Sequence, residues 1–178
     1  MDATLLTRSV MALRYPLVIV ALLLLTACGF HLRGYKEAVT LQASSIYLQT
    51  ADSGDIAQAV RAQLKAGNTR LTDTAEAAQY VLSLGRQKLE RRVLSVSATT
   101  GKAEEYQLIL SVLISITGPD GESLLSDQII RVSRDYTFDE DAVLGKSSEE
   151  EVLLGDLANQ AADQILSRLD AVTRQQTR

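Results

Sequence analysis

The two side chains best suited to chemistry, Cys28 and His31, each occur once in 178 residues and lie three positions apart. A single cysteine excludes an intramolecular disulfide and any all-cysteine metal site. A single histidine excludes zinc motifs built on a histidine pair and leaves a nucleophilic triad only one candidate base. The sequence also lacks a glycine-rich phosphate loop and a G-x-S-x-G motif. We therefore predict that the protein is not an enzyme and that it uses no cofactor or metal ion.

The position of Cys28 indicates another use for its thiol. Arg8 and Arg14 precede the apolar run Leu17–Leu25, and small residues follow it. This order is typical of a secretory signal, and the run is too short to span a bilayer, which needs about 20 apolar residues. The segment Leu25–Cys28 resembles a bacterial lipobox, in which the cysteine becomes the first mature residue and carries several acyl chains. We predict a lipoprotein signal peptide at 1–27, lipidation of Cys28 and anchoring of the protein to a membrane.

The residue after Cys28 is Gly29 rather than aspartate, which resembles the sorting signal of outer-membrane lipoproteins in proteobacteria. We expect the anchor in the outer membrane rather than in the inner one. The start of translation stays open between Met1 and Met11. The net charge of −4 argues against a nucleic-acid partner, because such proteins are usually basic.

The rest of the chain shows hydrophobic patterns of both strands and helices. Alternating patterns predict strands, and four-residue spacing predicts helices that begin at Asp55 and at a capping box of Ser148 and Glu151. We predict an α+β fold with a mostly antiparallel four-stranded sheet and two helices on one face, in the order β-α-β-β-β-α. The first two strands are expected to be parallel if they are adjacent. The predicted strands cover 45–49, 78–96, 105–117 and 124–138, inside a domain at 44–174, which a tether at 28–43 precedes and a frayed tail at 175–178 follows.

Basic side chains are concentrated on the predicted strands at 78–96 and 124–138 and in the turn that follows the first of them: Arg86, Lys88, Arg91, Arg92, Lys102, Arg131 and Arg134. Arginine binds phosphate through two parallel hydrogen bonds, so a basic band across a sheet suits a phosphorylated lipid. The alternative is a solvated sheet face whose charges protect its edge. Arg134 could instead be a partly buried arginine that pairs with a carboxylate.

Several motifs resemble the LptE family of LPS-assembly lipoproteins, in the order that the family has them: Cys28–Arg33, Val60–Leu64, Gly101–Gln107, Arg131–Tyr136 and Ala161–Leu169. The resemblance implies a lipoprotein that is anchored in the inner, periplasmic leaflet of the outer membrane. It also implies that the protein plugs and helps to assemble the barrel of an LptD-like partner. It also implies support for the delivery of lipopolysaccharide to the cell surface, with direct lipopolysaccharide contact. The alternatives are an auxiliary lipoprotein of another envelope lipid-transport system and, more weakly, a periplasmic lipoprotein hydrolase.

The candidate lipopolysaccharide-binding residues come from two sources. Arg131 matches a basic strand position of the family. Lys102 lies close to a second basic position of the family, which is Thr99 or Thr100 in this chain. Arg91 and Arg92 come from the charge pattern alone.

Overall fold

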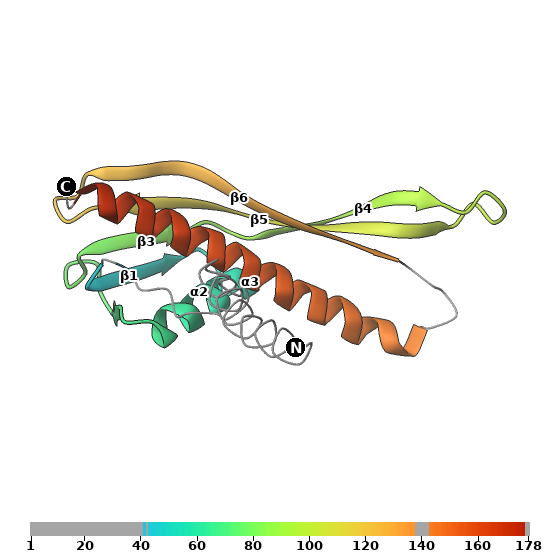
Figure 1. The fold of residues 1–178 in the computed structure, drawn as a ribbon, viewed down its shortest axis with the longest axis horizontal. Coiled ribbons are helices and arrows are strands. Elements are labelled where there is room, and N and C mark those ends of the chain that lie inside the picture. The colour runs from blue at the N-terminus through green and yellow to red at the C-terminus, as the bar shows by residue number, and fades with distance from the viewer. Residues whose placement is uncertain (1–40, 42, 138–142, 177–178) are drawn as a thin grey trace, which may run out of the picture. The chain divides into compact units, whose positions relative to one another are not determined.

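The computed structural model describes residues 41, 43–137 and 143–176 (Figure 1). They belong to the second of two units of the chain, Glu37–Arg178. The predicted signal peptide, Cys28 and His31 lie outside the described residues. The elements in chain order are β1 (Ser45–Thr50), α2 (Asp55–Ala66), β2 (Arg70–Thr72), β3 (Tyr80–Leu84), β4 (Lys88–Val96), β5 (Ala103–Thr117), β6 (Ser123–Thr137) and α3 (Val143–Gln176). Neither of these two helices is apolar enough over its length to cross a membrane.

The described sheet has six strands, so the predicted four-stranded sheet is wrong in two places. The three-residue β2 is too short to show a period, and it pairs in parallel with β1. The segment predicted as one strand at 78–96 divides at 85–87 into β3 and β4, which pair with different parts of β5. The predicted parallel pairing is confirmed, since β1 lies beside β3. The other pairs are antiparallel, and β6 pairs along most of β5.

Both helices cover the same face of the sheet, as predicted (Figure 1). Alternate side chains of β5, from Leu108 to Ile116, are at most 3% exposed and share one core with α2 and α3. On the other face, Leu113 of β5 is 41% exposed and Ile129 of β6 is 59% exposed. We call these two sides of the sheet the helix face and the open face.

Side chains from elsewhere in the chain determine how α2 begins. The N-cap of α2 is Gly54, not Asp55. Glycine has no side chain that could cap the helix. The Gln87 side chain instead accepts a hydrogen bond from the Ile56 backbone N–H at 3.1 Å and donates one to Asp55 at 3.2 Å. The break between β3 and β4 therefore supplies the cap that the local sequence lacks.

The start of α3 also differs from the prediction. Its backbone is helical from Val143, so Ser148 lies inside the helix and cannot be its N-cap. A serine followed by a glutamate three positions later is a capping box only where the helix begins there. The pattern could not show that the helix extends further toward its N-terminus.

A bulge interrupts β6 and changes which of its residues face the core. Leu125 pairs with Ile116, but Gln128 pairs with Ile114, so β6 has one extra residue between them. Asp127 lies in this bulge and has a φ of 45°, the left-handed region. The alternation of side chains therefore shifts phase at the bulge, which the sequence pattern did not reveal.

Candidate anion-binding surface

The alternation of β4 places two neighbouring candidate residues on opposite faces of the sheet. Arg91 pairs with Leu108 of β5, and Arg92 pairs with Gln107. Leu108 is fully buried in the core. Because directly paired residues project to the same side, Arg91 lies on the helix face and Arg92 on the open face. The predicted basic band is therefore split between the two faces.

On the helix face, Arg91 is already bound by a carboxylate. Its Nη2 donates hydrogen bonds to both carboxylate oxygens of Glu150 on α3, at 2.6 and 2.5 Å. The guanidinium also lies 5.6 Å from the centre of the Tyr106 ring, which stacks on Tyr136 at 5.7 Å. The bond to Glu150 is the main reason that the pKa of Arg91 is raised above its usual value. Glu150 thus occupies the position that an anionic ligand of Arg91 would need.

Arg134 has a similar role on β6. It pairs with Leu108 from the other edge of β5, so it also lies on the helix face. Its guanidinium is 3.8 Å from the carboxylate of Asp156 on α3, and its side chain is 53% exposed. The predicted pairing with a carboxylate is confirmed, but the side chain is not buried.

The open face carries a separate basic group. Arg131 of β6 and Lys88 of β4 both pair with Ser111, so they flank the same residue of β5. Glu90 lies two positions from Lys88 and forms an ion pair with it at 2.6 Å. We call Lys88, Glu90, Arg92 and Arg131 the open-face cluster.

The pKa of Glu90 is lowered by the positive charges of this cluster. The hydrogen bond from Lys88 is the main cause that lowers the pKa of Glu90, and Arg131 and Arg92 lower it further. Among the described residues, no ion pair within 4.0 Å engages Arg92 or Arg131. Both guanidinium groups are therefore available for an external anion such as a phosphate.

Lys102 lies beyond one end of the open-face cluster. It is exposed in the turn between β4 and β5, five residues before Gln107, the partner of Arg92, and nine before Ser111. At about 3.3 Å per strand residue, these separations are about 17 and 30 Å. Of the four predicted candidates, only Arg92 and Arg131 lie on strands with their side chains on the open face, opposite β5 residues that are four positions apart. The structure adds Lys88, which strand alternation alone would have grouped with Arg92.

No group of three or more metal-ligating side chains occurs in the described part of the chain. The donors of the open-face cluster are arginine and lysine side chains, which suit an anionic ligand.

Two solved structures with a similar fold are bacterial lipoproteins. Rare lipoprotein B from Shewanella oneidensis is 31% identical, has a TM-score of 0.66, and covers 75% of this chain and 99% of its own. An uncharacterized lipoprotein B from Nitrosomonas europaea is 26% identical, has a TM-score of 0.68, and covers 82% of this chain and 92% of its own. The fold is thus an α+β arrangement that these lipoproteins share.

Sequence comparison identifies the family. Residues 41–169 match the family model described as LptE, Lipopolysaccharide-assembly. The LPS-assembly lipoprotein LptE of Pectobacterium atrosepticum is 32% identical over 160 residues, which cover 84% of this chain and 80% of the relative. That of Photorhabdus laumondii is 31% identical over 150 residues, with the same coverage. The chain belongs to the LptE family.

Proposed function

We propose that this protein is an outer-membrane lipoprotein that supports lipopolysaccharide assembly as the plug of an LptD-like barrel. The match to the LptE family over most of the domain carries this proposal. The relatives are named as assembly lipoproteins, which also fits the prediction that the protein is not an enzyme. Acyl chains on Cys28 would anchor the protein in the periplasmic leaflet, where it could meet the barrel from inside the cell envelope.

The composition of the open face supports a plug inside a barrel. The interior of an outer-membrane barrel is polar, in contrast to its lipid-facing exterior. The open face combines charged and hydroxyl side chains with one exposed apolar pair, Leu113 and Ile129, which face each other across β5 and β6. A surface of this mixed kind can pack against a polar wall with hydrogen bonds and small apolar contacts.

We place lipopolysaccharide contact at the open-face cluster. Arg92 and Arg131 have no ion-pair partner among the described residues, and phosphate groups accept two parallel hydrogen bonds from one arginine. Lys102 is a second candidate, since its exposed position at the end of the β4–β5 hairpin suits contact away from the sheet. Arg91 is a weaker candidate, because a ligand must first displace Glu150.

Co-purification tests the plug. The full chain, carrying a C-terminal tag, is expressed in its native envelope, and outer membranes are solubilised in mild detergent. The expected result is a stable complex with one large β-barrel protein, identified by mass spectrometry. A Cys28→Ala variant controls for the anchor, because it should accumulate without lipid and yield less complex. Recovery of the lipidated protein without any barrel would contradict the proposal.

A further inference from the structure

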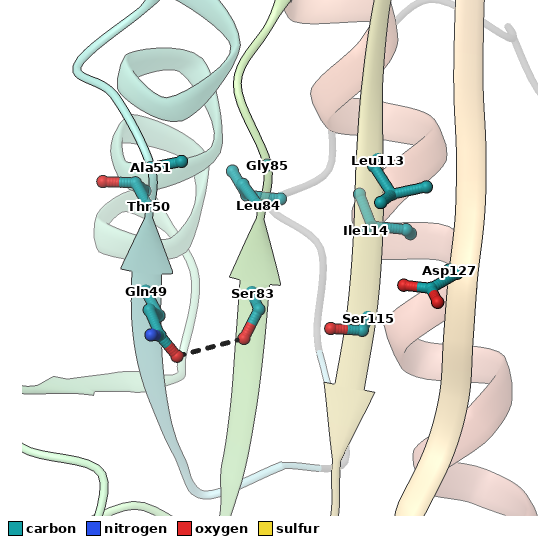
Figure 2. Close-up of a pocket in the computed structure, with 10 residues that line it drawn as sticks. All are labelled: Gln49, Thr50, Ala51, Ser83, Leu84, Gly85, Leu113, Ile114, Ser115 and Asp127. Atoms are coloured by element: carbon teal, nitrogen blue, oxygen red, sulfur yellow. Dashed lines mark hydrogen bonds between the residues drawn. The ribbon is translucent and has the colours of Figure 1, made fainter.

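Two irregularities of the sheet face the same stretch of β5. On one edge, β3 ends at Leu84 and β4 resumes at Lys88. On the other edge, β6 bulges at Asp127. Between them, a hollow of about 280 Å³ opens beside Leu113 and Ser115 (Figure 2). Bulges commonly adjoin functional sites because they redirect a side chain out of the regular alternation.

A row of polar side chains crosses the sheet at this hollow. Strand pairing aligns Gln49 of β1 with Ser83 of β3 and Ser83 with Ser115 of β5. Asp127 continues the row on β6, and all four residues line the hollow (Figure 2). The Ser83 hydroxyl donates to the Gln49 side-chain oxygen at 3.2 Å, which leaves the Gln49 amide group to donate. Four adjacent strands span about 14 Å at about 4.8 Å per strand.

An apolar strip lies beside the polar row. Leu113 is 41% exposed and lines the hollow together with Gly85. The Gly85 N–H donates to the Leu113 carbonyl at 2.8 Å, and a Cβ added at Gly85 would lie 3.3 Å from the Leu113 Cβ. A larger residue at this position would press on Leu113 and reduce the hollow.

The backbone of Asp127 gives a second, independent reason to regard the hollow as a site. Asp127 is the one non-glycine residue with a positive φ in the described part of the chain. Glycine would adopt this conformation without steric cost, so the backbone does not require a carboxylate here. Left-handed conformations of non-glycine residues are concentrated at functional sites. The strained position thus keeps an acceptor at the end of the polar row.

We propose that this hollow binds a short neutral glycan. A carboxylate can accept hydrogen bonds from two neighbouring sugar hydroxyls, while the amide and serine groups bond to further hydroxyls. Leu113 offers an apolar surface to the C–H groups of a sugar ring. The hollow has no basic side chain in its lining, so its ligand differs from the phosphate suited to the open-face cluster. The hollow shares Leu113 with the surface proposed to pack against the barrel, so glycan binding is tested on the protein without the barrel.

Amide chemical shifts of the ¹⁵N-labelled full chain test the proposal. Two lipid-free probes, each made neutral by reduction of its carboxyl groups to alcohols, are titrated separately: dephosphorylated core oligosaccharide released from lipopolysaccharide, and the disaccharide repeat of peptidoglycan. The expected result is saturable shifts of the Ser83, Leu113 and Ser115 amides with one of them, which identifies the source of the glycan. If neither probe shifts these amides at millimolar concentration, the proposal is wrong.

Variants of Asp127 separate binding from folding. Asparagine tolerates the left-handed conformation but lacks the charge, so Asp127→Asn should weaken glycan binding about tenfold or more. Asp127→Gly should also lose binding, while its melting temperature stays close to that of the unmodified chain, because relief of the backbone strain offsets the greater entropy of the unfolded chain. Asp120→Asn, in the turn between β5 and β6, is the matched control and should bind like the unmodified chain. Equal glycan affinity of the Asp127→Asn variant and the unmodified chain would overturn the proposal.

Discussion

The two faces of the sheet carry similar arginines in opposite situations. Arg91 and Arg134 lie on the helix face, where α3 places Glu150 in hydrogen-bond contact with Arg91 and the Asp156 carboxylate 3.8 Å from Arg134. Arg92 and Arg131 lie on the open face, where no ion pair among the described residues engages them. The comparison shows that an arginine is available for a ligand only where no carboxylate of α3 lies beside it. The type of residue does not decide this.

The largest expected difference between the faces is the loss of unfolding free energy when a packed side chain is removed. Two leucines of β5 allow this comparison. Leu110 is 1% exposed on the helix face, and Leu113 is 41% exposed on the open face. We expect Leu110→Ala to lower the free energy of unfolding by about 2–5 kcal/mol, because it leaves a cavity in the core. Leu113→Ala should cost about 1 kcal/mol or less, since it removes little buried surface. Urea denaturation measures both, and equal losses would contradict the assignment of the two faces.

The next largest effect is expected from charge reversal, which tests whether the arginines of each face bind lipopolysaccharide or stabilise the fold. Arg92→Glu with Arg131→Glu should weaken lipopolysaccharide binding about tenfold or more, because two charge-assisted contacts become repulsive. The unfolding free energy should change by less than about 1 kcal/mol. Arg91→Glu with Arg134→Glu is the matched pair for the helix face. It should mainly lower stability, because each new carboxylate lies close to Glu150 or Asp156.

Binding of labelled lipopolysaccharide in detergent, together with thermal denaturation, separates these outcomes. The proposed contact surface would be wrong if the open-face pair bound normally and the helix-face pair lost binding while remaining folded. In that case the arginines beside α3 would be the ligand site.

The smallest expected effect concerns the hydrogen bonds between Arg91 and Glu150. Glu150→Gln removes a partly exposed ion pair, so the unfolding free energy should fall by about 1 kcal/mol or less. Lipopolysaccharide affinity should rise a few-fold, because the guanidinium then has no competing carboxylate. Glu151→Gln, an exposed neighbour on α3, is the control and should change neither quantity. Unchanged affinity in the Glu150→Gln variant would show that Arg91 has a structural role only.

Regular periodicity made most of the fold predictable. Alternation from Tyr106 to Ile116 identified the central strand, and four-residue spacing of Ile56, Val60 and Leu64 identified α2. The placement of both helices on one face followed because each helix and each strand has one apolar side. The parallel pairing of β1 and β3 followed from the helix that connects them.

The predictions failed where the periodicity is interrupted. The strand at 78–96 divides at Gly85, and β6 gains a residue at Asp127, but neither change disturbs the hydrophobic pattern enough to be seen. The three residues of β2 are too few to establish any period. The hollow lies between two of these interruptions, so the sequence analysis could not predict it.

The sequence by itself determined the class of protein. Its single cysteine next to a short apolar run, its alternating and helical patterns, and its motifs indicated a lipoprotein of the LptE family with an α+β domain. These features are local, so neighbouring residues suffice to show them. The prediction of lipidation at Cys28 rests on the sequence alone, because that residue lies outside the described part of the chain.

Only the tertiary structure decided which charges are available to a ligand. Arg91 and Arg92 are adjacent in the chain, but β-pairing directs them to opposite faces, and Glu150 reaches Arg91 from 59 residues away. Such contacts depend on the register of strands and on the path of α3 across the sheet, which no local pattern encodes. The structure thus turned one predicted basic band into an ion-paired helix face and an open face with available arginines.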